Sequence, residues 1–595
     1  MRTAIATVCL SGGLVEKLHA CAAAGFDGVE IMDADLVAAY ESPEEIRALC
    51  DRLGLTVDLF QPFRDFEGVD EATFADNLRR AEAKFDVMQR LGADTVLVCS
   101  NVATATIGDD EVAARQLGEL ADRAAERGIR IAYEALAWGR FVDDYRHAWR
   151  IVEMADRPNL GTCLDSFHIL SRGHDPSAIE DIPGEKIFFL QLADAPALDM
   201  DVLSWSRHHR LFPGEGSFDL TAFLGHVLRA GYAGPLSLEV FNDTFRQTDV
   251  VRTAAHARRS LTWLADRTAE AAGWSTDRLT AAAAPLAVDF VEFKGENLGP
   301  LEEMLDRIGF TFRGRHRSKP VRLWSAGETR VILNEKARHE APQLAAIGVR
   351  VDDAAEAADR AESLGAPRVF RRTYAGEQDL RAVAAPDGTE VYWNDQPAES
   401  SWVAEFDGGG PEQQLSGVVD HINLAQPWQD FDEAVLFYSS VLGLAAESST
   451  DVPGPSGLVR SQVMRTDDGV LRIPLNLAPP TAPVPAQHVA VRCDDVVAVA
   501  REARQRGLRF LPIPDNYYDD LAARFGLDPS TLDVLRELDL LYDRDADGEF
   551  IHFYTPIVGG VFLELVERRG AYDGYGAPNA PVRLAAQREN GTVTA

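Results

Sequence analysis

Four segments in the first half of the chain set its architecture: RIAYEALAW (130–138), LGTCLDSFH (160–168), KIFFLQLAD (186–194) and PLSLEVFND (235–243). Apolar residues fill both faces of each segment, which is typical of parallel strands covered on both sides. Each segment nevertheless carries one polar side chain near its end. These four residues are Glu134, Asp165, Gln191 and Glu239. The pattern predicts four successive parallel strands that bring oxygen atoms to one edge of a sheet.

Four further strand-like runs precede these segments, at residues 3–9, 28–33, 56–63 and 94–100, and the later four span 130–136, 160–167, 186–194 and 235–241. Amphipathic helix patterns separate the runs, and most of these helices end at a glycine. Strand–helix units repeated eight times in about 250 residues predict an α/β fold, a (β/α)8 TIM barrel over residues 1–272. An open doubly wound sheet is the alternative, but the sequence has no GxGxxG motif or P-loop to mark its ligand site.

Burial of the four polar residues has an energetic cost that a cation can offset. A carboxylate buried without a partner costs several kcal/mol. The carboxyl ends of barrel strands form the functional face of such enzymes. Oxygen ligands from Glu134, Asp165, Gln191 and Glu239 suit a hard divalent cation such as Mg²⁺, Mn²⁺ or Co²⁺. The alternative is that each residue is hydrogen-bonded inside the barrel without a metal.

Other polar residues follow the same strand ends and are candidates for catalysis. His168 lies three residues after Asp165, and we expect it to act as a base or proton shuttle. The alternative is that it orients a metal ligand. Arg64 follows the third strand in QPFRDF (61–66), and Ser206 and Arg210 follow the seventh in SRHHR (206–210). We expect these donors to bind an anionic group of a small-molecule substrate.

The second half of the chain carries an internal repeat. After a linker near 272–286, four units open with a strand and a helix and continue as strands, starting with AVDFVEF (287–293), LAAIGVRVDD (344–353), GVVDHINL (417–424) and QHVAVRCDD (487–495). The repeat predicts four βαβββ modules of α+β type, arranged as two pairs over residues 286–400 and 415–595.

His421, His488 and Glu564 lie on predicted strands of the second pair. Two imidazoles and one carboxylate suit Fe²⁺ or another divalent ion such as Mg²⁺. Alignment of the two pairs places other residues at the equivalent positions of the first pair. In the same order, these are Phe290, Ala346 and a residue near Trp393. We therefore expect a second metal site in the second pair and a ligand-free first pair; the alternative is that both histidines are hydrogen-bonded core residues.

Composition limits the partners and the compartment. The net charge of -35 argues against nucleic acid or an anionic membrane as a partner. The cysteines have no CxxC or zinc-site spacing, which favours reduced core residues. They are Cys9, Cys21, Cys50, Cys99, Cys163 and Cys493. We find neither a signal-peptide pattern nor an apolar run of about 18 residues, the length of a membrane span. We expect a cytoplasmic protein.

At these motifs the chain resembles known families. The first half resembles the xylose-isomerase-like sugar isomerase/epimerase barrels, and its ligand set, with QPFRDFEG (61–68) and RLFPGEG (210–216), is similar to that of the metal-dependent 3-dehydroshikimate dehydratases. The second half resembles 4-hydroxyphenylpyruvate dioxygenase, of the vicinal-oxygen-chelate superfamily, in DHINL (420–424), RIPLN (472–476), QHVAV (487–491), FLELVER (562–568) and GYGAPN (574–579). The order of the parts resembles the bacterial two-domain 3-dehydroshikimate dehydratase family. This resemblance implies dehydration of 3-dehydroshikimate to protocatechuate in quinate and shikimate catabolism.

The second half departs from the dioxygenase pattern in two places. His552 stands where the family has a glutamine, and the closing segment has Pro578 inside it and Ala580 where the family has a lid phenylalanine. We therefore expect a poorly sealed pocket that keeps its metal and loses oxygenase chemistry. Such a domain would serve structure or assembly, through which the chain can form homo-oligomers.

Two other functions remain open. One is a sugar or polyol isomerase/epimerase, or an inosose dehydratase, carried by the barrel. Isomerases of this group tend to have histidine where this chain has Gln191, so the glutamine favours a dehydratase. The other is an Fe(II) dioxygenase carried by the second half, with the barrel in support.

Overall fold

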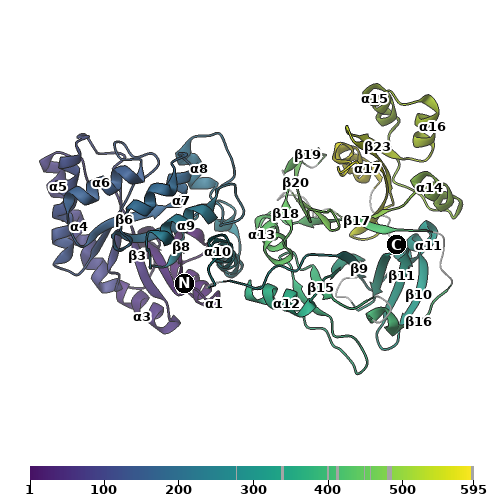
Figure 1. Cartoon of the computed structure of the whole chain (residues 1–595), viewed down its shortest axis with the longest axis horizontal. Coiled ribbons are helices and arrows are strands. Elements are labelled where there is room, and N and C mark those ends of the chain that lie inside the picture. The colour runs from purple at the N-terminus through teal and green to yellow at the C-terminus, as the bar shows by residue number, and fades with distance from the viewer. Residues whose placement is uncertain are drawn as a thin grey trace. The chain divides into compact units, whose positions relative to one another are not determined.

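The structure is a computed structural model that describes residues 1–595 except 276–277, 337–340, 398–400, 411–414, 448, 456, 479–485 and 591–595. The chain divides into two compact units, Met1–Leu279 and Thr280–Ala595, which Figure 1 colours from purple to teal and from teal to yellow. In the described part of the chain, no helix has the length and apolar character that a membrane span requires.

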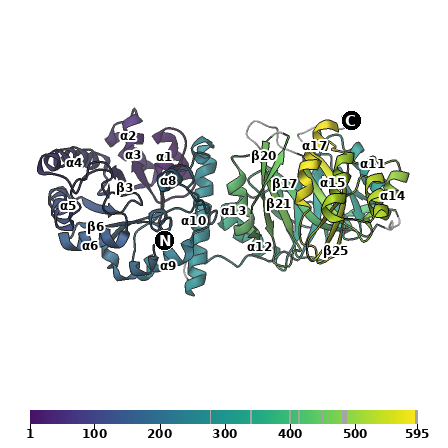
Figure 2. The same cartoon turned by 90° about the horizontal axis from the view of Figure 1, so that it is seen from above.

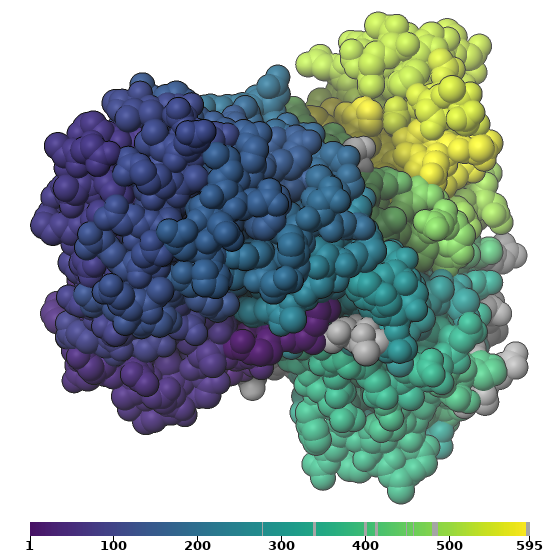
Figure 3. Space-filling model, turned by 60° about the vertical axis from the view of Figure 1, so that its left-hand side comes forward, coloured from purple at the N-terminus to yellow at the C-terminus, as the bar shows by residue number. Residues whose placement is uncertain are grey.

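The first unit is a closed barrel of parallel strands in the order β1 to β8. The strands are β1 (Thr3–Ala6), β2 (Gly28–Met32), β3 (Thr56–Phe63), β4 (Thr95–Cys99), β5 (Arg130–Glu134), β6 (Leu160–Asp165), β7 (Ile187–Leu192) and β8 (Leu236–Leu238). Figure 2 shows helices around the barrel wall, and Figure 3 shows the outer surface that they form. The predicted (β/α)8 fold is confirmed.

Helices separate the strands of this unit, as the sequence predicts. They are α1 (Leu14–Ala23), α2 (Asp33–Ala38), α3 (Pro43–Leu53), α4 (Glu71–Leu91), α5 (Asp110–Ala125), α6 (Tyr145–Ala155), α7 (Ser166–Leu170), α8 (Val202–His208), α9 (Leu220–Arg229) and α10 (Val250–Ala272). Helix α3 is typical. Ser42 and Glu45 form a capping box at its start, and Gly54 ends it in the left-handed conformation, with φ 73°.

Side chains in the barrel interior form layers, because residues two apart on a strand point to the same face. One layer is apolar and includes Leu97, Ala132, Cys163 and Phe189. Two residues further along the same strands come Cys99, Glu134, Asp165 and Gln191. The predicted polar residues of β5, β6 and β7 therefore lie next to this apolar layer, on the side of the carboxyl ends of the strands.

The second unit contains two related sheets. The first pair of modules consists of β9 (Ala287–Lys294), α11 (Gly299–Ile308), β10 (Thr311–His316), β11 (Val321–Ala326), β12 (Thr329–Asn334), β13 (Gln343–Arg350), α12 (Ala354–Ser363), β14 (Arg381–Ala384), β15 (Glu390–Asn394) and β16 (Phe406–Gly408). Their sheet runs β14-β15-β13-β9-β12-β11-β10-β16. The second module departs from the predicted βαβββ pattern. In its described part, the segment between α12 and β14 pairs with the sheet only through an isolated bridge from Arg368 to Val383 of β14.

The second pair follows the same plan. It consists of β17 (Val418–Gln426), α13 (Phe431–Leu442), β18 (Ala445–Ala446), β19 (Thr450–Gly454), β20 (Gly457–Arg465), β21 (Arg472–Leu477), β22 (Gln487–Arg492), α14 (Val496–Gln505), α15 (Asp515–Phe525), α16 (Pro529–Glu537), β23 (Leu541–Arg544), β24 (Gly548–Tyr554), β25 (Val561–Gly570) and α17 (Ala580–Asn590). In both pairs the first strands of the two modules pair antiparallel at the centre of the sheet, β9 with β13 and β17 with β22.

Strand register agrees with the predicted alignment of the two pairs and identifies the third residue. Ala490 pairs with His421 on one side and Glu564 on the other. Gly348 pairs in the same way with Phe290 and Tyr392. The counterpart of Glu564 is therefore Tyr392, next to Trp393. Phe290 and Tyr392 pack together in an apolar cluster with Ala346, so the first pair fills with core residues the positions that hold His421, His488 and Glu564 in the second.

Packing between β6 and β7 gives a test of the barrel. A Cβ atom added at Gly161 would lie 2.5 Å from the carbonyl oxygen of Lys186 and 2.7 Å from a ring carbon of Phe188. At Gly118, inside α5, the nearest such atom is 3.8 Å away. We expect Gly161→Ala to destabilise the protein by about 1–3 kcal/mol through overpacking, and Gly118→Ala to stabilise it by roughly 0.5–1 kcal/mol. Calorimetric unfolding temperatures should move in opposite directions; equal shifts would contradict the packing at Gly161.

Candidate active site

A cavity of about 450 Å³ opens at the carboxyl ends of the barrel strands. Several predicted site residues line it, on β5 and on the loops that follow β3, β6, β7 and β8. They are Arg64, Glu134, His168, Ser206, Arg210 and Glu239. Asp165 and Gln191 are fully buried at the ends of β6 and β7, where they are paired in the sheet register.

The structure brings the predicted carboxylate ligands together. Ligand atoms of Glu134, Asp165 and His168 lie within 4.8 Å of one another. Glu239, just past β8, joins this group through Arg210, whose Nη1 donates to Asp165 Oδ2 at 2.8 Å and to Glu239 Oε2 at 3.1 Å. Glu134 Oε1 is buried and has no hydrogen-bond partner in the described part of the chain. An unpaired buried carboxylate oxygen is a position where a cation is expected.

Gln191 is held by a residue that the sequence analysis did not single out. Its Nε2 donates to Glu30 Oε2 at 2.6 Å, and Cys163 Sγ lies 3.5 Å from its Oε1. Glu30 belongs to β2, in the apolar run GVEIM (28–32). A polar residue inside a buried apolar strand is the signal that identified the other four residues, and it applies equally to Glu30.

The electrostatics of the site favour a bound cation. Burial, with the nearby charges of Asp165 and Glu239, raises the pKa of Glu134 well above its usual value. Burial also raises the pKa of Glu239 to about 7. For Asp165 burial acts in the same direction, but Arg210 and His168 outweigh it and lower the pKa. Repulsion between these carboxylates would fall if a divalent ion bound between them. Glu134 and Asp165, with an oxygen of Glu134 that has no partner among the described residues, fit such an ion.

His168 is neutral, and a donor approaches each nitrogen of its ring. Burial lowers its pKa to about 3, with Arg210 also lowering it against the opposite effect of Asp165. The backbone N–H of Ala137 lies 3.1 Å from Nδ1, and Arg210 Nη2 lies 3.3 Å from Nε2. Because both of these groups can only donate, the contacts do not select one tautomer. Nε2 is 3.6 Å from Asp165 Oδ2, and the ring packs edge-on against Trp138, with centroids 5.0 Å apart.

Arg210 lies in a different environment from the one expected for a substrate-binding residue. Its side chain is 1 % exposed, and it donates to Asp165, Glu239 and Ser206. It also lies over the ring of Phe167, 4.6 Å from the centroid. Arg210 therefore offsets part of the charge of the carboxylate cluster, and Ser206, which also lines the cavity, accepts its hydrogen bonds. Arg64 lines the same cavity, and its guanidinium has no hydrogen bond or ion pair to any described residue.

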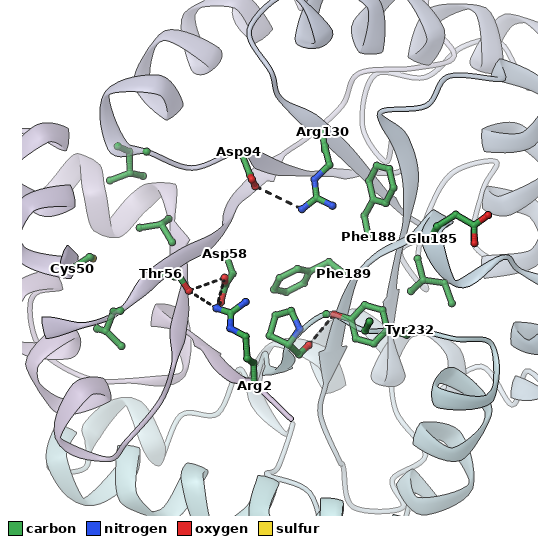
Figure 4. Close-up of a pocket in the computed structure, with 18 of the residues that line it drawn as sticks. Arg2, Cys50, Thr56, Asp58, Asp94, Arg130, Glu185, Phe188, Phe189 and Tyr232 are labelled. Carbon is green, nitrogen blue, oxygen red and sulfur yellow. Dashed lines mark hydrogen bonds and ion pairs between the residues drawn. The ribbon is translucent and has the colours of Figure 1, made fainter.

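A larger cavity, of about 750 Å³, lies at the amino ends of the strands. Figure 4 shows several of its polar groups paired with one another. Arg2 donates to Asp58 at 3.0 Å and to Thr56 at 2.5 Å, and Arg130 lies 3.7 Å from Asp94. Residues at the amino end of a TIM barrel contribute to stability, whereas catalytic residues lie at the carboxyl end. The smaller cavity is therefore the candidate active site.

The predicted residues of the second unit also converge. His421 Nε2 and His488 Nε2 are 3.3 Å apart, and Glu564 Oε2 lies 3.2 Å from the first and 3.1 Å from the second. Asp420 is 2.9 Å from His421 Nδ1 and fixes the ring so that Nε2 faces the cluster. Burial lowers the pKa of His421, but Glu564 and Asp420 outweigh burial and raise this pKa to about 9. This two-histidine, one-carboxylate set fits a divalent metal.

The closing segment corrects the expectation of a poorly sealed pocket. Pro578 lies in a 3-10 turn, Ala577–Asn579, that precedes α17, so it does not interrupt the helix. Asn579 is fully buried, and its Nδ2 lies 3.0 Å from His552 Nε2. His552 Nδ1 in turn lies 2.6 Å from Glu564 Oε1. An asparagine thus covers the site in place of the lid phenylalanine.

Comparisons with known proteins agree with this architecture. Residues 18–267 match the xylose isomerase-like TIM barrel family, 283–407 the N-terminal part of hydroxyphenylpyruvate dioxygenase, and 418–553 the glyoxalase/bleomycin resistance protein/dioxygenase superfamily. A solved structure described as a xylose isomerase-like TIM barrel/4-hydroxyphenylpyruvate dioxygenase fusion protein is 42% identical, with a TM-score of 0.90, over 99% of this chain and 100% of that one.

Two curated relatives match over nearly the whole chain. The 3-dehydroshikimate dehydratase of Pseudomonas aeruginosa is 45% identical over 99% of this chain and 98% of its own length. That of Pseudomonas putida is 43% identical over 98% of both. The chain therefore belongs to the 3-dehydroshikimate dehydratase family, in the form that joins a xylose-isomerase-like barrel to a dioxygenase-like domain.

Proposed function

We propose that the barrel dehydrates 3-dehydroshikimate to protocatechuate. The observation that carries the proposal is the buried carboxylate cluster, which surrounds an unpaired oxygen of Glu134 at the mouth of the barrel. The substrate has a ketone, a neighbouring hydroxyl group and a second hydroxyl group one carbon further on. Loss of the proton next to the ketone and departure of that second hydroxyl group as water, followed by enolisation, give the aromatic product. Because aromatisation is strongly favourable, the first proton transfer is the step to accelerate.

Glu134, Asp165, Gln191 and Glu239 would hold the cation. A bound Mg²⁺, Mn²⁺ or Co²⁺ ion would supply Lewis-acid stabilisation of the negative charge that develops on the ketone oxygen. Arg210 offsets part of the negative charge of the cluster through Asp165 and Glu239. It therefore favours the ionised form of both carboxylates and fixes their positions.

His168 and Arg64 would act on the substrate directly. His168 lines the cavity in its neutral form, so its ring can take up a proton. We assign it the proton transfer: the ring takes the proton next to the ketone and returns a proton to the departing hydroxyl group, which leaves as water. Uptake at Nε2 requires the resting proton to lie on Nδ1, so the ring must release the Ala137 N–H. Arg64, with an unengaged guanidinium at the cavity, is the residue we assign to the substrate carboxylate.

Metal dependence is the first test. We expect a chelator to inactivate the protein, and Mg²⁺, Mn²⁺ or Co²⁺ to restore the formation of protocatechuate, which is followed by its absorbance. Glu134→Gln should lower cation affinity and abolish turnover, because an anionic ligand is lost. Glu292→Gln is a matched control, since Glu292 is a buried glutamate of the other unit. Full activity of metal-free protein would rule out the mechanism.

The role of His168 is the second test. We expect His168→Ala to keep the cation and to lose turnover by about 10²–10⁴-fold, the usual loss for a group in proton transfer. His168→Gln should lose about as much activity as His168→Ala, because an amide cannot take up the proton. Cation content is measured beside the turnover number. Much higher activity in His168→Gln would favour a hydrogen-bond donor over a base, and a parallel loss of cation would favour a ligand or its support.

For the second unit we infer a divalent ion of the Fe or Mg class held by His421, His488 and Glu564 in a supporting role. Two observations support this inference over a dioxygenase. His552 engages Glu564, and Asn579 covers the site. We expect His421→Ala to lower the unfolding temperature, because an ion that binds only the native state stabilises it, and to leave dehydration unchanged without consumption of oxygen. Loss of dehydration in folded protein whose barrel cation is retained would contradict this division of roles.

A further inference from the structure

We propose that Glu30 is a positioning residue that orients the amide of Gln191, so that the oxygen of this amide faces the cation. The inference rests on the proposed ligand set and adds a residue outside it. Glu30 is fully buried in β2. Its Oε2 accepts hydrogen bonds from Gln191 Nε2 at 2.6 Å and from Gln61 Nε2 at 2.7 Å, and its Oε1 is hydrogen-bonded to Ser237 Oγ.

Hydrogen-bond chemistry fixes which way the Gln191 amide points. An amide nitrogen can only donate, and a carboxyl oxygen without a proton accepts. If Glu30 is ionised, both of its oxygens accept. If it is protonated, the proton lies on Oε1 and is donated to Ser237 Oγ, so Oε2 still accepts from both amides. In either state the Gln191 nitrogen turns to Glu30, and the oxygen takes the opposite side of the amide group.

The Gln191 oxygen is left available for a cation. Among the described residues, the Cys163 thiol is its hydrogen-bond partner, at 3.5 Å, and a thiol is a weak donor. The sheet register pairs Gln191 with Asp165 on one side and with Ser237 on the other. The amide therefore lies between a proposed cation ligand and the residue that holds the far oxygen of Glu30.

Ser237 makes the orientation testable with variants of almost unchanged shape. In Glu30→Gln, the new amide oxygen can still accept from Gln191 and Gln61 while its NH2 group donates to Ser237 Oγ. In Ser237→Ala, Glu30 keeps both of its amide donors. In the double variant the NH2 group of residue 30 has no hydroxyl acceptor. The nearest remaining acceptor is the oxygen of Gln191 or Gln61, so one of these amides must turn over.

The experiment measures the Mn²⁺ dissociation constant by calorimetry on chelator-treated full-length protein, with the unfolding temperature beside it. We expect each single variant to bind Mn²⁺ nearly as tightly as the wild type. The double variant should bind about 10–100-fold more weakly, the usual loss when a group that orients a ligand is removed. If Glu30 acts by orienting Gln191, the loss of Mn²⁺ affinity in the double variant is much larger than the sum of the losses in the two single variants. If the double variant does not fold, Glu30→Gln still tests the proposal, because weak Mn²⁺ binding by this single variant would overturn it.

Two results would overturn the proposal. If Glu30→Gln alone weakens Mn²⁺ binding as much as the double variant, the charge of Glu30 matters and orientation does not. If the folded double variant binds Mn²⁺ like the wild type, Glu30 only fills the barrel. Gln191→Leu separates this failure from that of the proposed site. Tight Mn²⁺ binding by Gln191→Leu would remove Gln191 from the ligand set, and failure of the wild type to bind Mn²⁺ would reject the barrel site itself.

Discussion

Repulsion among buried carboxylates at the carboxyl ends of the barrel strands is the constraint on which the site depends. Glu134 and Glu239 line one cavity, ligand atoms of Glu134 and Asp165 lie close together, and burial raises the pKa of Glu134 and Glu239. Arg210 offsets part of their charge from a fully buried position. The remaining negative charge lies beside an oxygen of Glu134 that has no partner among the described residues. This charge is the main reason to expect a divalent cation in the barrel. His168 and Arg64 then take their roles from their positions around that cluster.

The second unit presents the same fold with and without metal ligands. Strand register equates His421, His488 and Glu564 with Phe290, Ala346 and Tyr392. The first pair of modules packs these residues into an apolar cluster, so metal ligands are not needed to form this sheet. In the second pair, His552 and Asn579 engage the remaining groups of the site. This closure is consistent with a domain that keeps a metal for stability while the barrel carries the chemistry.

Sequence patterns predicted the parts of the site that depend on strand alternation. Buried polar residues in apolar runs predicted Glu134, Asp165, Gln191 and Glu239, and the same signal was present at Glu30. The role of Arg210 could not be read in this way, because its partner Asp165 lies 45 residues away in sequence. The groups that contact the two ring nitrogens of His168, the backbone N–H of Ala137 and the guanidinium of Arg210, come from other segments of the chain, and no local pattern reports them. Pro578 was expected inside a helix, but the turn that contains it ends before the helix begins.

The central claim is that a cation sits among the barrel carboxylates of the active enzyme. Anomalous X-ray diffraction from crystals grown with Mn²⁺, of protein that converts 3-dehydroshikimate in the same buffer, tests it directly. The account predicts a manganese peak within bonding distance of oxygens of Glu134, Asp165, Gln191 and Glu239. A barrel without a peak at these residues, in protein that is active with Mn²⁺, would contradict it.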